Sequence, residues 1–250
     1  MTLPDITTLQ WVFAFLSAAC IGLSKTGFGG IAVPGILLMA QVLPVRESTG
    51  VVLPLLIIAD LYAIRAFRSY VKWKVLLKLL PPAVIGIALG WFLMPLIPAH
   101  DFGPLIGWLI IALLVVAILQ KLSPHLQKIA GDHPAIAWPL GLIAGCTTMI
   151  ANASGAVVTI YLLACRLPKY EFVGTGAWFF FIMNVIKVPF SASLGLITPS
   201  TLIFNFTLIP GIACGLILGR FLLGKINQQA FEWTLIALSL LGSLRLVWQH

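Results

Sequence analysis

Charge is what this sequence has least of. Only 9% of its 250 residues are charged, while 60% are hydrophobic; a soluble domain carries roughly 25% charged residues. With so little charge the chain cannot cover a water-facing surface, so much of its surface must face lipid. No polar linker or low-complexity run divides the sequence. We therefore predict a single membrane domain over residues 1–250.

Motifs of catalysis and metal binding are also missing. The sequence contains no HExxH, GxSxG or Walker A pattern, and its four cysteines form no CxxC pair. We therefore expect no enzyme, no metal and no other cofactor. The net charge of +8 comes without a nucleic-acid-binding motif, and it fits the excess of Lys and Arg in cytoplasmic loops of membrane proteins. The first ten residues hold no Lys or Arg, so we expect no cleaved signal peptide.

Long hydrophobic runs are abundant, and two regions differ from the rest. Residues 9–43 and 136–167 each read as an apolar arm, a polar tip containing glycine, and a second arm. Arms of roughly 12–16 residues reach only ~18–24 Å, less than the ~30 Å membrane core. We predict re-entrant hairpins or broken helices here, and full transmembrane helices near residues 48–67, 76–97, 103–120, 172–190, 200–222 and 232–248.

The order of these segments occurs twice. Leu43-Pro44 matches Leu167-Pro168, and at the same spacing Glu47, Gly50 and Asp60 match Glu171, Gly174 and Asn184. We predict an all-α polytopic membrane protein built from two repeats, at about 6–122 and 134–248. Each repeat would contain a pair of short helical arms followed by three transmembrane helices.

Basic residues predict the orientation. Five cluster after the first long span, and the following loop, residues 98–103, has none. Because Lys and Arg favour cytoplasmic loops, we place the cluster inside, both termini outside, and the chain in the cell inner (plasma) membrane. The two repeats then have inverted topology, an arrangement typical of transporters with a substrate site near the midplane.

The first hairpin tip, residues 24–30, is the leading candidate site. It carries Lys25 next to several glycines. A lysine at membrane depth usually has a partner or a ligand, and the start of the second arm would add backbone N–H groups. An anion site is one interpretation of this pattern. The alternatives are a lysine paired with an acid such as Asp60, or one whose head reaches the membrane interface.

The second tip has no charge but several polar groups. Asn152 and Ser154 lie at its arm junction and could bind oxyanion oxygens. Thr147 and Thr148 could do the same or could bond their own backbone. Asn184 is a candidate neutral substrate ligand, whereas Asp60 could carry a coupling proton or hold Lys25. Lys187 could attract an anion or could extend to the membrane edge.

Other polar and small residues have structural interpretations. Glu47 and Glu171 follow the two Leu-Pro turns, so we expect them to be first-turn acids that stabilise a helix dipole. The spacings Gly86/Gly90 and Gly211/Gly215/Gly219 are typical of close helix–helix packing.

Both tip sequences resemble a known family. Residues 22–30 read Gly-x-Ser-Lys-x-Gly-x-Gly-Gly, and a degenerate second copy precedes Leu167-Pro168-Lys169. The pattern is similar to the TauE/SafE sulfite exporter family, also called the 4-toluene sulfonate uptake permease family, over nearly the whole chain. The second copy has fewer glycines than the family pattern. By position, the resemblance implies substrate-binding roles for Lys25, Thr26, Gly27, Gly29, Gly30, Asn152, Ser154 and Gly155.

The function predicted from these observations is secondary transport. We expect a carrier of sulfite or a small organosulfonate, working as an exporter by alternating access in the lipid bilayer. It could act alone or as a homodimer. The alternatives are an anion channel that uses the same site, or a membrane enzyme or assembly factor of sulfur metabolism.

Overall fold

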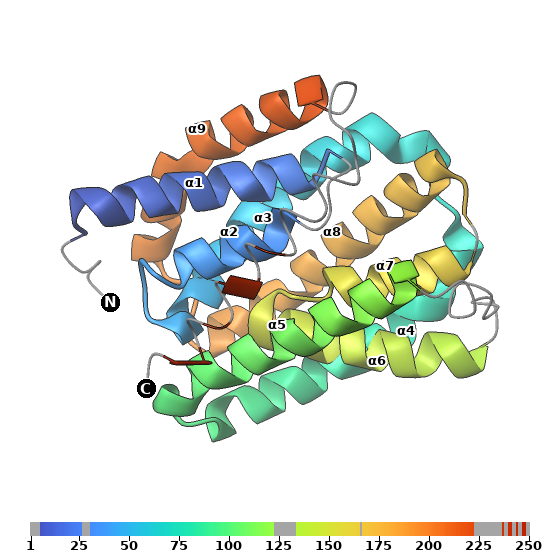
Figure 1. Ribbon diagram of the computed structural model, residues 1–250, viewed down its shortest axis with the longest axis horizontal. Coiled ribbons are helices and arrows are strands. Elements are labelled where there is room, and N and C mark those ends of the chain that lie inside the picture. Colours follow the sequence, from blue (N-terminus) through green and yellow to red (C-terminus); the bar gives the residue numbers. More distant parts are fainter. Residues whose placement is uncertain are drawn as a thin grey trace.

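The protein folds as a bundle of helices. The computed structural model describes residues 6–26, 31–122, 134–165 and 167–222, together with residues 237, 240, 241, 244, 247 and 248. All regular elements in these ranges are helical, as predicted (Figure 1). They are α1 (Thr8–Ser24), α2 (Ala32–Met39), α3 (Val45–Phe67), α4 (Trp73–Leu93), α5 (Ala99–Leu122), α6 (Pro134–Ala151), α7 (Gly155–Ala164), α8 (Lys169–Ser193) and α9 (Pro199–Leu222), with short 3-10 turns at Arg68–Tyr70 and Met94–Leu96.

Four helices are long and apolar enough to cross a membrane. These are α3, α4, α8 and α9, at four of the six positions predicted from the sequence. The predicted span at 103–120 lies within α5, and the described part His100–Ala112 of this helix is a shorter apolar helix. The predicted span at 232–248 falls mostly outside the described residues.

The two predicted arm pairs are broken helices of unequal length. The first arms, α1 and α6, have 17 and 18 residues, whereas the second arms, α2 and α7, have 8 and 10. All four lengths lie outside the predicted range of roughly 12–16 residues, because each first arm continues to its tip while each second arm ends before the Leu-Pro step. Both predicted acids, Glu47 and Glu171, lie in the first turn of their helices, α3 and α8.

Glycines join two pairs of parallel helices. A Cβ atom at Gly215 of α9 would overlap the carbonyl oxygen of Ala19 on α1, and one at Gly145 of α6 would overlap that of Ala83 on α4. Gly86 and Gly90 of α4 contact α6 in the same way. The predicted packing role of Gly86, Gly90, Gly211, Gly215 and Gly219 is confirmed. Each first arm therefore lies against a helix from the other half of the chain (Figure 1).

Helices α3 and α8 run antiparallel through the centre. Gly50 near the start of α3 meets Leu196 just after α8, and Gly174 near the start of α8 meets Phe67 and Tyr70 at the end of α3. We call the end where α3 finishes and α4 and α8 begin the cationic end, because it holds Arg65, Arg68, Lys72 and Lys74.

Each hairpin enters and leaves at one end of the bundle. At the end away from the cationic one, the Gln10 side chain near the start of α1 donates to the Val42 carbonyl just before α3, at 3.4 Å. At the cationic end, the Tyr161 hydroxyl of α7 donates to the Val75 carbonyl in the first turn of α4, at 3.1 Å. The first hairpin thus begins and finishes at the end away from the cationic one, and the second begins and finishes at the cationic end. The opposite directions of the two hairpins are those expected of inverted repeats. The duplication itself stays a prediction.

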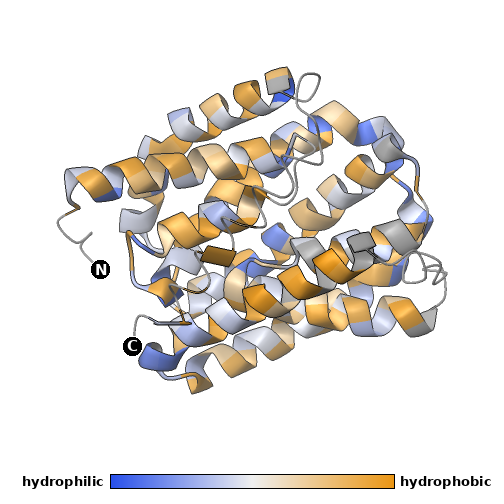
Figure 2. Cartoon of the chain, viewed as in Figure 1, coloured by the Kyte–Doolittle hydropathy of each residue, from blue (hydrophilic) through white to orange (hydrophobic). Residues whose placement is uncertain are grey.

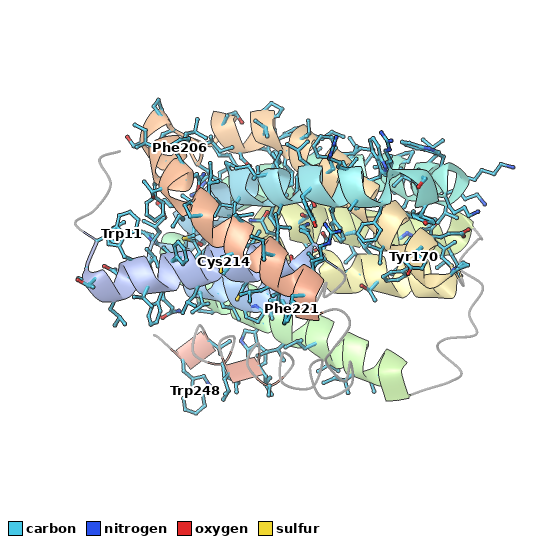
Figure 3. The ribbon with its side chains drawn as sticks, turned by 90° about the horizontal axis from the view of Figure 1, so that it is seen from above. Trp11, Tyr170, Phe206, Cys214, Phe221 and Trp248 are labelled. Carbon is cyan, nitrogen blue, oxygen red and sulfur yellow. The ribbon has the colours of Figure 1, made fainter. Side chains whose placement is uncertain are left out.

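The outer faces of the helices are apolar. Hydrophobic residues run along the helices while hydrophilic ones gather mainly near helix ends (Figure 2). Large exposed side chains on α9 include Phe206, Ile217 and Phe221. Figure 3 shows Trp11 and Phe206 toward one end and Tyr170 toward the other, and all three are exposed. Exposed rings near both ends of an apolar bundle are typical of a membrane protein, in which aromatic residues mark the two interfaces.

Candidate functional site

The site is built around a contact between residues that occupy matching places in the two halves. Asp60 of α3 and Asn184 of α8 each lie ten positions after the glycine, Gly50 or Gly174, at which their helix meets the end of the other. Asn184 Nδ2 donates to Asp60 Oδ2 at 2.7 Å, and both residues are buried. The contact therefore lies about midway along the antiparallel pair, close to the centre of the bundle.

Lys25 reaches this contact from the first hairpin tip. It follows the last residue of α1, and its Nζ atom lies 2.7 Å from Asp60 Oδ1 and 4.8 Å from the ring centre of Phe180. Asp60 Oδ1 has no aligned hydrogen-bond donor among the described residues, so the contact is an ion pair without hydrogen-bond geometry. Of the alternatives for Lys25, pairing with Asp60 is observed. The side chain is 11% exposed, so it does not extend to the interface.

Asn152 forms the corner of the second tip. Its φ of 53° is left-handed, a conformation that Asn tolerates better than most residues because its short side chain can bond locally. The side-chain amide donates to the Thr49 carbonyl of α3 at 2.9 Å, and the side-chain oxygen accepts a hydrogen bond from Lys187 Nζ. The broken helix is thereby tied to both central helices.

Lys187 is the cation of the second tip, although it belongs to α8. It is 1% exposed, so the prediction that it could extend to the membrane edge is wrong. The reason is that Lys187 faces the end of α6, where Nζ donates to the carbonyl and the hydroxyl of Thr148 at 2.9 and 3.1 Å. It also lies 3.4 Å from Asn184 Oδ1. The tip that carries no charge in the sequence obtains one from a neighbouring helix.

These six side chains form one continuous polar network at the centre of the bundle. We call this set the central network: Lys25, Asp60, Thr148, Asn152, Asn184 and Lys187. It contains two ammonium groups and one carboxylate, a formal charge of +1. Within the described residues no other carboxylate lies in ion-pair distance of either lysine. Because a buried charge is unfavourable unless it is paired, this excess favours the entry of an anion.

A cavity of about 110 Å³ adjoins the central network. A water molecule needs only ~10–15 Å³ on this measure, so the space fits several waters or one small anion. It extends from the central network toward the cationic end, along Ala63 of α3 and Phe172 and Gly176 of α8. The polar side chains that line it come from both hairpins and from α8: Ser24, Lys25, Thr148, Asn152, Ser154, Thr159 and Asn184.

The structure brings together most of the residues singled out in the sequence. Lys25, Asn152, Ser154, Gly155 and Asn184 all line this cavity, while Asp60 and Lys187 lie directly behind it in the central network.

The remaining residues of the first motif are not seen at the cavity. Thr26 is elsewhere, because its hydroxyl donates to the Leu23 carbonyl at 2.7 Å and its side chain packs against Gly219. Gly27, Gly29 and Gly30 lie outside the described residues.

Sequence reasoning left Thr148 undecided and did not single out Thr159 or Phe180. Each stands four positions from a predicted residue: Thr148 before Asn152, Phe180 before Asn184, and Thr159 after Gly155. Residues four apart share a face of a helix. Helical spacing from the predicted residues was therefore the signal that could have found all three.

Comparison with known proteins identifies the family. The family model described as sulfite exporter TauE/SafE matches residues 11–246, and neither the curated proteins nor the solved structures give a match. The matched region contains both hairpins and every residue of the central network. With its apolar helices and its polar centre, this chain belongs to the TauE/SafE family of sulfite exporters, which are membrane transport proteins.

Proposed function

We propose that this protein exports sulfite or a small organosulfonate through the plasma membrane by alternating access. The observation that carries the proposal is that two lysines share a single carboxylate in the central network, beside a cavity between two hairpin tips. A membrane interior offers an anion no other compensation for its lost hydration, so such a cavity selects for negative charge.

The donors around the cavity suit an oxyanion. Lys25 supplies an ammonium and Ser154 supplies a hydroxyl. The amide groups of Asn152 and Asn184 donate one N–H to Thr49 and Asp60, and each keeps a second N–H for an oxyanion. Helix α7 begins at Gly155, which lines the cavity, so its N-terminal dipole favours negative charge there. Sulfite and sulfonates present the same face of sulfur-bound oxygens. These donors therefore recognise the chemical class and do not separate its members.

The shape of the cavity supports a carrier more than a channel. The cavity runs toward the cationic end, whereas the other side of the central network is closed where Asn152 bonds to the Thr49 carbonyl and Gly50 packs on Leu196. If the cationic end is cytoplasmic, as the Lys and Arg distribution favours, this is the inward-facing state. Two inverted repeats with external termini would produce the outward-facing state by exchanging their conformations.

The test is sulfite flux in proteoliposomes with Lys25→Gln. Losing a hydrogen bond to a charged group removes roughly 1.5–3 kcal/mol, so we expect the apparent affinity for sulfite to fall at least about tenfold. Lys72→Gln is the matched control, because Lys72 is half exposed, pairs with Glu171 and does not line the cavity. Unchanged flux in Lys25→Gln would contradict the role of the charge, and flux that never saturates would favour the channel.

A further inference from the structure

The ammonium of Lys187 is enclosed by oxygen atoms that carry no formal charge. Nζ lies 2.9 Å from the Thr148 carbonyl oxygen, 3.1 Å from the Thr148 hydroxyl and 3.4 Å from Asn184 Oδ1, and it also bonds to Asn152 Oδ1. The side chain is 1% exposed. A lysine held in this way by a carbonyl, a hydroxyl and two amide oxygens sits in a shell of the kind that coordinates a monovalent cation.

The position of these four oxygens in the fold supports their likeness to a site for a monovalent cation. Thr148 belongs to the last turn of α6, where the helix dipole presents its negative end. Asn152 stands at the left-handed break that follows. Carbonyl oxygens and C-terminal ends of broken helices are the groups with which transporters hold coupling cations near the midplane. A divalent metal is a poorer match, because Ca²⁺ and Mg²⁺ sites are usually built with carboxylates.

We propose that Lys187 is a tethered cation that fills a site for a small monovalent cation, so that the protein needs no bound Na⁺ or K⁺. This inference rests on the proposed function: the positive charge behind the anion site comes from a side chain of the protein and not from a bound cation. It also makes a prediction about the shell. If Lys187 is shortened, the four oxygens remain around an empty space, and a free monovalent cation should bind there.

The experiment measures the thermal stability of purified Lys187→Ala in different chloride salts at equal ionic strength. Na⁺, K⁺ and NH₄⁺ are compared with N-methylglucamine, a cation too large for the space. At roughly one hundred times its Kd, a bound cation should raise the unfolding midpoint by about 5 to 10 °C. The wild-type protein should show no such difference among the cations. Lys187→Thr adds a hydroxyl to the same space and carries the test if the alanine variant cannot be purified.

Three controls locate the effect. Lys187→Met fills the space with an apolar chain and should not respond to the cation. Thr148→Val in the Lys187→Ala background removes one ligand and should raise the apparent Kd severalfold. Lys72→Ala removes a lysine from the surface ion pair with Glu171 and should behave like wild type.

Equal midpoints of Lys187→Ala and Lys187→Thr in all four salts would overturn the proposal. Failure of both variants to fold in every cation would contradict it too, because a free cation is expected to replace the missing ammonium. These measurements do not depend on transport. If sulfite flux is absent but the cation response is present, the proposed substrate is wrong and the tethered cation stands. If flux is present but the response is absent, only the tethered cation fails.

Discussion

The Lys25–Asp60 ion pair makes a quantitative prediction about stability. Breaking a buried pair by removing one partner is unfavourable by ~3–5 kcal/mol, because it leaves an uncompensated buried charge. Lys25→Gln leaves the fully buried Asp60 without its ion-pair partner, so the variant should lose about 3–5 kcal/mol. Asp60→Asn leaves Lys25 and Lys187 without a carboxylate in the central network, so its loss should fall in the same range, about 3–5 kcal/mol.

The double variant separates pairing from simple packing. Lys25→Gln with Asp60→Asn replaces two charges by two amides that can bond to each other and to Asn184. Replacing both members of a buried pair is often close to neutral, so we expect a stability within about 1 kcal/mol of wild type. The two single effects would then fail to add by several kcal/mol, as coupled neighbours do.

Thermal unfolding in detergent, followed by tryptophan fluorescence, would measure these differences. For a chain of this size ~1 kcal/mol corresponds to a shift of about 2–4 °C, so the single variants should melt roughly 6–20 °C below wild type. The double variant should melt near wild type but remain deficient in sulfite transport. Single effects that add in the double variant would refute the reasoning, because independent residues would then explain them.

Two further predictions concern the backbone. Gly145→Ala should lower stability by about 1–3 kcal/mol through overpacking, because its Cβ atom would overlap the Ala83 carbonyl oxygen. Gly176→Ala is the matched control, since the nearest neighbour of its Cβ atom would be a Leu162 methyl at 3.5 Å, and thermal unfolding should place it close to wild type. Asn152→Ala should lose the bonds to α3 and α8 and add about 1–2 kcal/mol of left-handed backbone strain. Asn152→Gly should melt higher than Asn152→Ala, because glycine removes that strain; the opposite order would contradict it.

Much of the helical layout could be predicted from hydropathy and from the repeated Leu-Pro steps. Apolar runs mark helices directly, and the polar tips at residues 24–30 and 147–155 mark the breaks between them. Hydropathy could not decide whether the arms were re-entrant, because the answer lies in contacts between distant residues. Gln10 meeting Val42 and Tyr161 meeting Val75 are such contacts.

Site residues could be predicted where a charged residue stands in an apolar run. They were harder to predict where helix packing sets the direction of a side chain. Lys25 and Asp60 stood out because a charged residue in an apolar run needs a reason, and their pairing was one of the alternatives. Lys187 was harder to place, since the direction of its side chain depends on how α8 is rotated against the end of α6. No local pattern around position 187 contains that information.

The pairing of α1 with α9 has a consequence for synthesis. Helix α1 packs its small residues against α9, which is synthesised about 180 residues later. At ~5–20 residues per second, α1 therefore waits roughly 10–40 s in the insertion machinery or in lipid before its partner exists. During that interval Lys25 first lacks Asp60 and then lacks Phe180, which are both synthesised after it. Until those residues exist, the nascent chain must hold an unpaired lysine in an apolar segment.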